Sequence, residues 1–229
     1  MPHMLITAGP THEPIDAVRY IANRSSGAMG AALTDAAMRA GWEVTLLLGP
    51  CAAKVPEGMR MYRFTTAAEL QALLEAHFPA CDVLIMAAAV ADYRPPLTGE
   101  PKRPRGREPW TLQLEPTPDL LAACAARKRR EQVVIGFALE PAARLEHGAA
   151  EKLRRKNLDA IVANPLETMG SPTIDARLFL PSGRAIAPGL MSKPAFADWL
   201  IGQCAALWSI GTFTAPTAID RCPPGQVAK

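Results

Sequence analysis

Few features of this sequence would cross-link the chain or place it in a membrane. Its five cysteines form no C-x-x-C pair, and none has a histidine at ligand spacing, so a disulfide framework and a zinc site are both disfavoured. No apolar run approaches the ~18 residues that a helix needs to span a bilayer, and no cationic and then apolar leader opens the chain. We therefore expect a soluble protein of the reducing cytoplasm.

A strong excess of either charge sign is also missing. The net charge is +3, and the basic residues fall in short clusters, such as 102–107 and 127–130, without interleaved aromatic side chains. This pattern disfavours nucleic-acid binding, because single strands are held by cations beside aromatic stacking platforms. A non-catalytic protein that binds nucleotides or nucleic acid stays open as an alternative.

The Gly-x-Gly-x-x-Gly fingerprint of dinucleotide-binding folds is absent as well. The second predicted strand, residues 43–48, ends without an acidic residue that could hold a ribose hydroxyl. An NAD(P)-dependent oxidoreductase of the Rossmann type is therefore a poorly fitting alternative, although a strand, a glycine-bearing loop and a helix do open the chain.

Short apolar runs alternate with helical patterns along the first two-thirds of the chain. Such alternation predicts an α/β fold, here a Rossmann-like, mostly parallel sheet with helices on both faces. Residues 174–180 and 184–187 predict an added β-hairpin, placed either on the sheet or in a dimer contact. The parallel strands are expected at 4–7, 43–48, 60–64, 82–89, 132–137 and 159–163.

The length and the 49% apolar content suit a single domain, residues 1–210. Residues 93–109 combine prolines, glycines and charges, which predicts a flexible lid. A last helix is expected from about 192 to 209, followed by a weakly ordered tail at 211–229. Thr66 to Glu69 form a predicted capping box, and Thr117-Pro118-Asp119 is a predicted helix start with proline at the first helical position.

The run NRSSGAMG at positions 23–30 is the most informative segment. It places an amide, a guanidinium and two hydroxyls before a helix start of small residues, which suits an anion and a carbonyl. Together with the preceding ITAGPTHEPIDAVRYIA, it resembles the opening motif of the phosphopantothenoylcysteine synthetases. Later motifs match that family in order: AAAVADYR at 87–94, PTPDLL at 116–121, VIGFA at 134–138 and KLRRKNLDAIVAN at 152–164.

This resemblance implies a ligase of coenzyme A biosynthesis. In that reaction 4'-phosphopantothenate and CTP give an acyl-cytidylate and pyrophosphate, and the amine of cysteine then captures the acyl group. Mg²⁺ with the nucleotide and a homodimer are also implied; the same ligation with ATP is the alternative. The family is the synthetase part of bacterial bifunctional decarboxylase/synthetases. Because the Pro-x-Met-Asn signature of the flavin-dependent half is absent, no flavin is expected.

The resemblance also implies which residues form the site. Asn23 and Lys102 are the implied catalytic residues, with Lys102 in the predicted lid. The implied binders of the acid substrate are Arg19, Asn23, Ala88, Ala89 and Asp92. The implied nucleotide-binding residues are Met86, Ala87, Ala88, Asp92, Lys102, Pro118, Asp119, Leu120, Leu121, Phe137, Lys152 and Lys156. No set of metal ligands is predicted.

Residue chemistry alone leaves alternatives for several of these roles. Lys152 and Lys156 project from one helix face, either toward one triphosphate or into solvent. Asp92 ends an apolar strand, where a carboxylate contacts a ligand or caps a turn. Phe137 stacks on a base or packs in the core.

Arg19 and two departures from the family pattern carry further alternatives. Arg19 binds the substrate phosphate or carboxylate, in its own or a neighbouring subunit, or it pairs with Glu13 or Asp16. Pro104 interrupts the basic run of the lid, and Leu139-Glu140-Pro141 stands where the family has a small residue followed by Glu-Thr. Lid geometry and nucleotide choice therefore depend on residues that differ from the family.

Overall fold

A computed structural model describes residues 1–96 and 101–213, with side chains up to residue 210. Its main strands are β1 (His3–Ala8), β4 (Glu43–Leu48), β5 (Arg60–Arg63), β6 (Val83–Met86), β9 (Val133–Glu140), β10 (Ala160–Pro165), β12 (Arg177–Phe179) and β13 (Ala185–Ile186). Its α-helices are α1 (Ala28–Arg39), α2 (Ala67–His77), α3 (Leu120–Ala126), α4 (Leu145–Arg155) and α5 (Lys193–Phe213). Three 3-10 turns are η1 (Phe78–Ala80), η2 (Ala142–Arg144) and η3 (Leu166–Thr168). Short strand pairs are β2 (His12–Pro14) with β3 (Tyr20–Ala22), β7 (Tyr93–Arg94) with β8 (Glu115–Pro116), and β11 (Thr173–Ile174) with β14 (Met191–Ser192).

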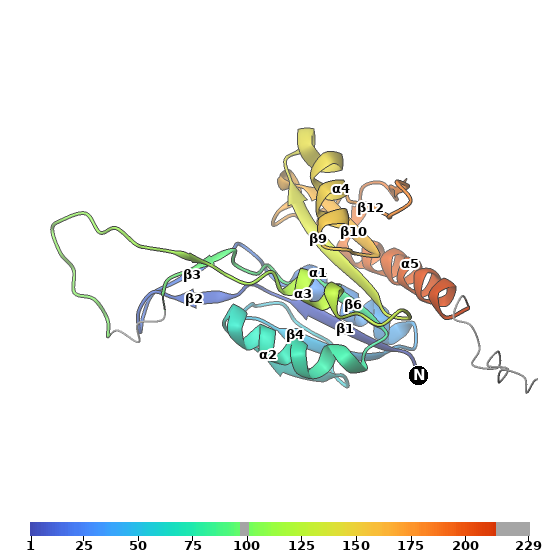
Figure 1. Ribbon diagram of the computed structural model, residues 1–229, viewed down its shortest axis with the longest axis horizontal. Helices are drawn as coiled ribbons and strands as arrows, with labels where there is room; N and C mark the ends of the chain where they lie inside the picture. Colours follow the sequence, from blue (N-terminus) through green and yellow to red (C-terminus); the bar gives the residue numbers. More distant parts are fainter. Residues whose placement is uncertain (97–100, 214–229) are drawn as a thin grey trace, which may run out of the picture.

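The main strands form one sheet in the order β13-β12-β10-β9-β6-β1-β4-β5 (Figure 1). The strands from β10 to β5 run parallel, and β12 and β13 join antiparallel at one edge. The predicted α/β fold with a mostly parallel sheet is therefore confirmed. The predicted hairpin corresponds to β12 and β13, which lie at the edge of the sheet, one of the two places considered for it.

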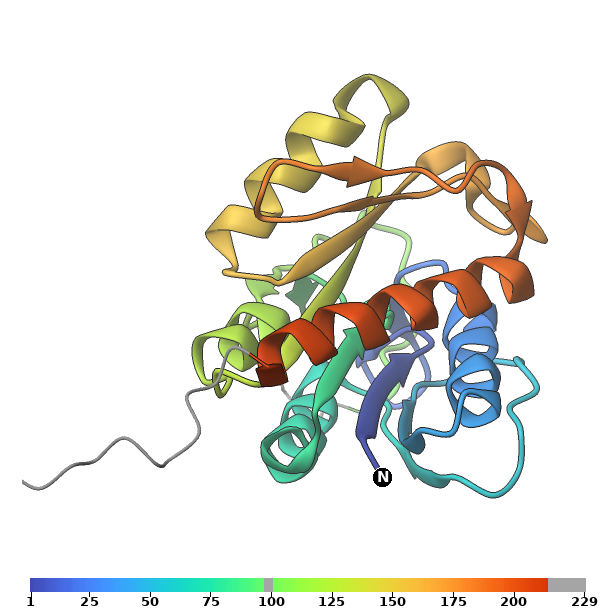
Figure 2. The same ribbon diagram turned by 90° about the vertical axis from the view of Figure 1, so that its right-hand side faces the viewer.

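Helices cover both faces of this sheet (Figure 2). Strand side chains alternate between the faces, so Met4 and Ile6 of β1 join the core under α1 and α5, whereas Leu5 joins the core under α2, α3 and α4. Parallel strands covered on both sides are buried at successive positions, which explains why β6 is a continuous apolar run and why β1 is buried from Met4 to Ala8 with Thr7 as its one polar residue there. Within the described ranges, no helix is both long and apolar enough to cross a membrane.

An arm leaves the body of the molecule and consists of residues 12–22 and 93–116, apart from 97–100 (Figure 1). The β2–β3 pair and the β7–β8 pair form its base, and residues 101–114 have no regular secondary structure. The two parts are tied together, because Arg103 N donates to Asp16 Oδ2 at 3.2 Å and Arg19 Nη2 donates to the Arg103 carbonyl at 3.0 Å. The predicted lid thus belongs to this arm, and its residues 97–100 lie outside the described part.

Some predicted boundaries were wrong. The strand expected at 82–89 ends at Met86, because the chain then turns away and Ala89 pairs only with Pro10. The last helix runs to Phe213, so residues 211–213 are helical and not tail; the rest of the predicted tail, 214–229, lies outside the described residues. β9 and β10 are longer than expected, since they stay paired up to Glu140 and Pro165.

The start of α3 also differs from the prediction. The N-cap is Asp119, whose carboxylate accepts a hydrogen bond from Ala122 N at 3.1 Å, so Pro118 precedes the helix. Thr117 does not cap it, because its hydroxyl donates to the Ala91 carbonyl at 2.5 Å. For α2, Thr66 accepts from Glu69 N at 3.2 Å as predicted, while the Glu69 carboxylate accepts from Thr65 N at 2.6 Å.

Candidate active site

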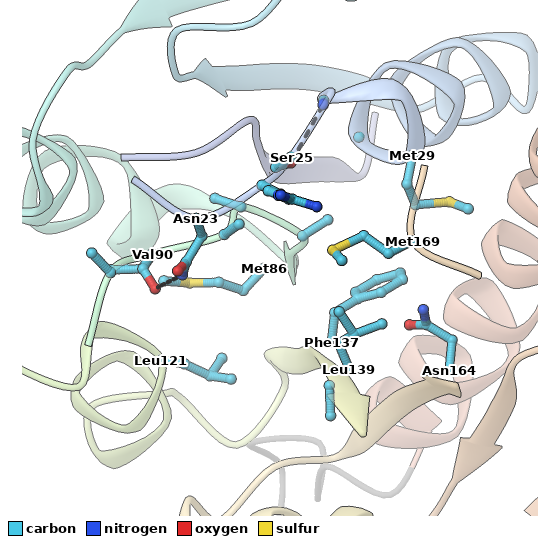
Figure 3. Close-up of a pocket in the computed structure, with 18 of the residues that line it drawn as sticks. Asn23, Ser25, Met29, Met86, Val90, Leu121, Phe137, Leu139, Asn164 and Met169 are labelled. Atoms are coloured by element: carbon cyan, nitrogen blue, oxygen red, sulfur yellow. Dashed lines mark hydrogen bonds between the residues drawn. The ribbon is translucent and has the colours of Figure 1, made fainter. Parts of the chain in front are cut away.

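A cavity of about 880 Å³ lies at the carboxyl ends of β6, β9 and β10 (Figure 3). The chain leaves β1 toward β4 on one side and returns to β6 on the other, so β1 and β6 form the point at which strand order reverses. Loops diverge at such a point and leave a crevice at the strand ends, where ligands of open α/β sheets bind. The strand order therefore makes this cavity a candidate ligand site.

The segment 23–30 forms one wall and joins β3 to α1. Asn23 Nδ2 donates to the Val90 carbonyl at 2.9 Å, which orients the amide at the cavity wall (Figure 3). Gly27 has φ +73°, and a Cβ there would lie 2.5 Å from Cys51 Sγ. Gly30 presses against β1, since a Cβ would lie 2.3 Å from Ala8 Cβ. Only glycine lets α1 start this close to the sheet.

The segment after β6 forms the floor, and two buried hydroxyls of the β1 region hold it. Thr7 Oγ1 accepts from Ala88 N at 3.0 Å, and Thr11 Oγ1 accepts from Ala91 N at 3.0 Å. These two hydrogen bonds give the N–H groups of Ala88 and Ala91 partners where the path of the main chain is irregular. Asp92 follows on this path; within the described residues its exposed carboxylate has no hydrogen-bond or ion-pair partner, so it does not cap a turn there.

Lys152 and Lys156 both line the cavity, and each ammonium is already paired with a carboxylate. Lys152 Nζ lies 2.6 Å from Glu140 Oε1, and Lys156 Nζ lies 2.9 Å from Asp119 Oδ2. Partial burial raises the pKa of the Asp119 carboxyl, but hydrogen bonds from Lys156 and from the Ala122 N–H outweigh it and hold the pKa below its ordinary value. The two lysines are therefore fixed at the cavity and do not form a solvated helix face.

Apolar side chains line the opposite part of the cavity. Phe137 and Met169 face the same open space, with Met29 above them (Figure 3). Phe137 is only partly buried and packs against the core under α1 and α5, while it also lines the cavity; stacking on a base stays a prediction. Leu139, at the altered position after the VIGFA motif, lies half-exposed at the cavity. A flat aromatic face beside flexible thioethers can accept a planar ligand.

Most residues implied by the resemblance meet in this cavity. The cavity-lining members are Asn23, Met86, Ala87, Ala88, Ala89, Asp92, Pro118, Asp119, Leu120, Leu121, Phe137, Lys152 and Lys156. Lys102 and Arg19 lie outside it, on the arm. Arg19 pairs with Asp16, which is the structural alternative considered for it, and its guanidinium lies 5.0 Å from the centre of the Trp110 ring. Glu13 is not its partner but accepts from Ala67 N at 2.8 Å.

Sequence reasoning missed one wall of the cavity. Asn164, Met169, Ile174 and Lys193 line it, and they come from the part of the chain that runs from the end of β10 to the first residue of α5. Asn164 ends the KLRRKNLDAIVAN motif at the end of a predicted strand, which is a signal that could have identified it. The other three had no motif, since only the folding of 166–193 beside β10 brings them to the site.

The described residues could bind Mg²⁺ only together with a phosphorylated ligand that supplies some of its ligand atoms. Within residues 1–96 and 101–213, no group of three histidine, cysteine or carboxylate side chains is arranged to hold a metal. Mg²⁺ commonly takes one or two protein carboxylates plus substrate phosphates and water. Asp92 is the cavity carboxylate without a partner among the described residues, so it fits the protein's part of such a set.

Comparisons with known proteins identify the family of this chain. Residues 2–207 match the family described as DNA/pantothenate metabolism flavoprotein C-terminal domain. The chain is 36% identical over 210 residues to the coenzyme A biosynthesis bifunctional protein CoaBC of Bacillus subtilis, covering 90% of this chain and 51% of that protein. It is 44% identical over 169 residues to a cysteine/cysteine sulfinic acid decarboxylase of an unknown prokaryotic organism, covering 73% and 47%.

A solved structure covers nearly the same extent. The crystal structure of the C-terminal domain of a CoaBC protein has a TM-score of 0.77 and 33% identity, covering 91% of this chain and 96% of that one. This chain spans about half the length of the curated relatives it matches. The resemblance found in the motifs is thus confirmed, and the chain belongs to the DNA/pantothenate metabolism flavoprotein C-terminal domain family.

Proposed function

We propose that this chain is a phosphopantothenate-cysteine ligase of coenzyme A biosynthesis that uses CTP. One observation carries the proposal: a single cavity joins the segment 23–30, the floor after β6, the start of α3, and the lysines in and directly after α4, Lys152 and Lys156. These are the segments whose motifs match the synthetase family. The name of the Bacillus subtilis relative also refers to coenzyme A biosynthesis.

The proposed reaction has two steps in one site. A carboxylate oxygen of 4'-phosphopantothenate attacks the α-phosphorus of CTP, and the bond to pyrophosphate breaks. The cysteine amine then attacks the acyl carbon, loses a proton to solvent, and CMP leaves. Such chemistry depends chiefly on positioning and on cations around the phosphates. A volume of about 880 Å³ suits two ligands held together, because it lies at the upper end of the range for small-molecule sites.

Named residues have distinct parts in this proposal. Lys152 and Lys156 neutralise triphosphate charge, and Phe137 packs against the base beside the main chain of Ala87 and Ala88. Asn23 donates to the acyl carbonyl. Asp92 would hold Mg²⁺ that arrives with CTP, and the ion would neutralise further phosphate charge.

The proposed roles of Lys102 and Arg19 require movement of the arm or a second subunit. Both lie on the arm and outside the cavity of their own chain. We place Lys102 over the triphosphate after movement of the arm, and Arg19 on the substrate phosphate or carboxylate in a neighbouring subunit of a homodimer. The proposal also takes the enzyme to be cytoplasmic and to need no flavin, nucleic acid or membrane.

Pyrophosphate release tests the proposed function. The full chain is incubated with Mg²⁺, 4'-phosphopantothenate and cysteine, with CTP, ATP or NADP⁺ in turn, and pyrophosphate and phosphopantothenoylcysteine are measured. We expect both products with CTP at a kcat/KM above that with ATP. A higher kcat/KM with ATP would show that ATP is the nucleotide substrate. Leu139, which departs from the family pattern, would then be the first residue to replace. Turnover of NADP⁺, or CO₂ release from cysteine without a nucleotide, would contradict the proposal.

A further inference from the structure

We propose that Glu140 is a positioning residue that holds the ammonium of Lys152 at the cavity, and that Gly148 provides the space for its carboxylate. The inference rests on the proposed function, since that proposal assigns Lys152 to the neutralisation of triphosphate charge. Glu140 does not line the cavity, whereas Lys152 does. Any effect of Glu140 on a ligand therefore passes through Lys152.

The pair is well defined because both partners come from regular elements. Glu140 is the last residue of β9, which stays paired with β10 up to that position. Lys152 lies on α4, which packs against β9 and β10. The Glu140 side chain is 14% exposed and that of Lys152 is 37% exposed, with 2.6 Å between Nζ and Oε1. The carboxylate is thus mostly enclosed, while the ammonium still reaches the cavity.

Gly148 explains how the carboxylate fits. It lies one turn before Lys152 on the same face of α4. A Cβ at this position would lie 2.9 Å from Cδ, 3.0 Å from Oε1 and 3.1 Å from Oε2 of Glu140. Glycine in a helix interior costs stability relative to alanine, so its use where a side chain would collide with Glu140 points to a constraint from the pair.

Holding a lysine before the ligand arrives has a kinetic consequence. A free lysine side chain loses much rotational freedom when it is fixed on a phosphate, and a lysine already held by a carboxylate loses less. Two N–H groups of the ammonium remain for the ligand while the third donates to Glu140. Since the transition state requires closer placement of charge than binding does, the loss of Glu140 affects kcat more than KM.

Three variants of the full chain test this inference. Glu140→Gln keeps the shape and removes the charge. Gly148→Ala keeps both charges and displaces the carboxylate. Gly202→Ala is the matched control, because Gly202 is an exposed glycine within α5 and a Cβ there meets nothing within 4 Å. The Gly202→Ala substitution should raise the thermal midpoint of unfolding, because alanine has a higher helix propensity than glycine.

For each variant, kcat and KM for CTP are measured from pyrophosphate release, together with the thermal midpoint. We expect Glu140→Gln and Gly148→Ala to lower kcat about tenfold or more while KM changes less than about threefold. Gly148→Ala should do so without a lower thermal midpoint, and Gly202→Ala should keep wild-type kcat. Unchanged kcat in both site variants, or a loss of activity only in proportion to a loss of folded protein, overturns the inference.

A second measurement separates this inference from the proposed function. Lysines are labelled with a water-soluble amine-reactive ester without any ligand, and labelling at Lys152 is followed by mass spectrometry relative to the exposed Lys54. Glu140→Gln should speed labelling of Lys152 several-fold, because the carboxylate no longer holds the amine. If the wild type turns over no nucleotide, the proposed function fails. Equal labelling of Lys152 in wild type and variant overturns the pairing itself.

Discussion

Asn23 has an orientation that suits the second step of the proposed reaction. One N–H of its amide is used by the Val90 carbonyl, at 2.9 Å, so the group is fixed while its second N–H remains available. A donor that is already aimed can stabilise charge as it develops on an acyl oxygen. The amide is also neutral, so it does not compete with the lysines for phosphate.

Asn23→Ala is therefore expected to separate the two steps. One lost donor is worth about 3 kcal/mol, or roughly a hundredfold in rate, and this loss should fall on amine capture. Rapid-quench analysis with CTP and 4'-phosphopantothenate should show acyl-cytidylate that accumulates on the protein while phosphopantothenoylcysteine formation collapses. An equal fall in pyrophosphate release and product formation would assign Asn23 to substrate binding instead.

At the scale of elements, the start of α3 couples helix capping to the site. The Asp119 carboxylate caps the helix through Ala122 N and also pairs with Lys156, the C-cap residue of α4. Its pKa is lowered in the folded protein. A lowered folded pKa means that the unfolded chain binds more protons in acid, so the stabilisation exists above the unfolded pKa of about 3.9 and is lost as pH falls through the folded pKa.

Two substitutions distinguish the cap from the charge. Asp119→Asn keeps a good N-cap and removes the ion pair, whereas Asp119→Ala removes both and should cost about 1 kcal/mol more in the free energy of unfolding. The difference between wild type and Asp119→Asn should shrink between pH 5 and pH 2, as measured by urea unfolding. Asp35→Asn, which breaks an exposed pair with Arg39, is the control and should change stability little. A difference that grows in acid would contradict the assignment.

At the scale of the whole molecule, the arm is the surface that a second copy of the chain would cover. Val18, Tyr20, Tyr93, Trp110 and Leu114 are exposed on it, and apolar groups gathered on one projecting element often mark an interface. The hairpin of β12 and β13, the other place considered for a dimer contact, has its Leu178 buried against the sheet. We therefore expect the homodimer to form through the arm.

Light scattering on the purified chain at micromolar concentration checks this expectation. The wild type should have the mass of a dimer, and Val18→Glu should lower it toward that of a monomer, because a charge on a 60% exposed arm residue must be desolvated on association. Leu190→Glu, on a 70% exposed residue outside the arm, should leave the dimer intact. A monomeric wild type, or equal effects of both substitutions, would show that the arm is not a dimer contact.

The order and type of the main elements, and many of the residues that line the cavity, could be predicted from the sequence alone. A continuous apolar run such as β6 identifies a strand covered on both faces, because a half-exposed strand would alternate polar and apolar residues. The motifs marked the strand ends and helix starts whose residues line the cavity, including Asn23, Phe137 and Lys152. Apolar runs and motifs are both local in sequence, so they can be recognised without knowledge of the fold.

How these segments meet could not be predicted from the sequence and follows from the fold. The neighbours of Glu140 and Arg19, the cap of α3 and the wall formed by Asn164 and Lys193 depend on groups far apart in sequence or on competition between nearby acceptors. Hydrophobic periodicity reports which face of an element is buried but carries no information on which charged side chains lie opposite one another. Those pairings follow from strand order and helix placement, which bring the end of β9, the start of α3 and one face of α4 to the same edge of the sheet.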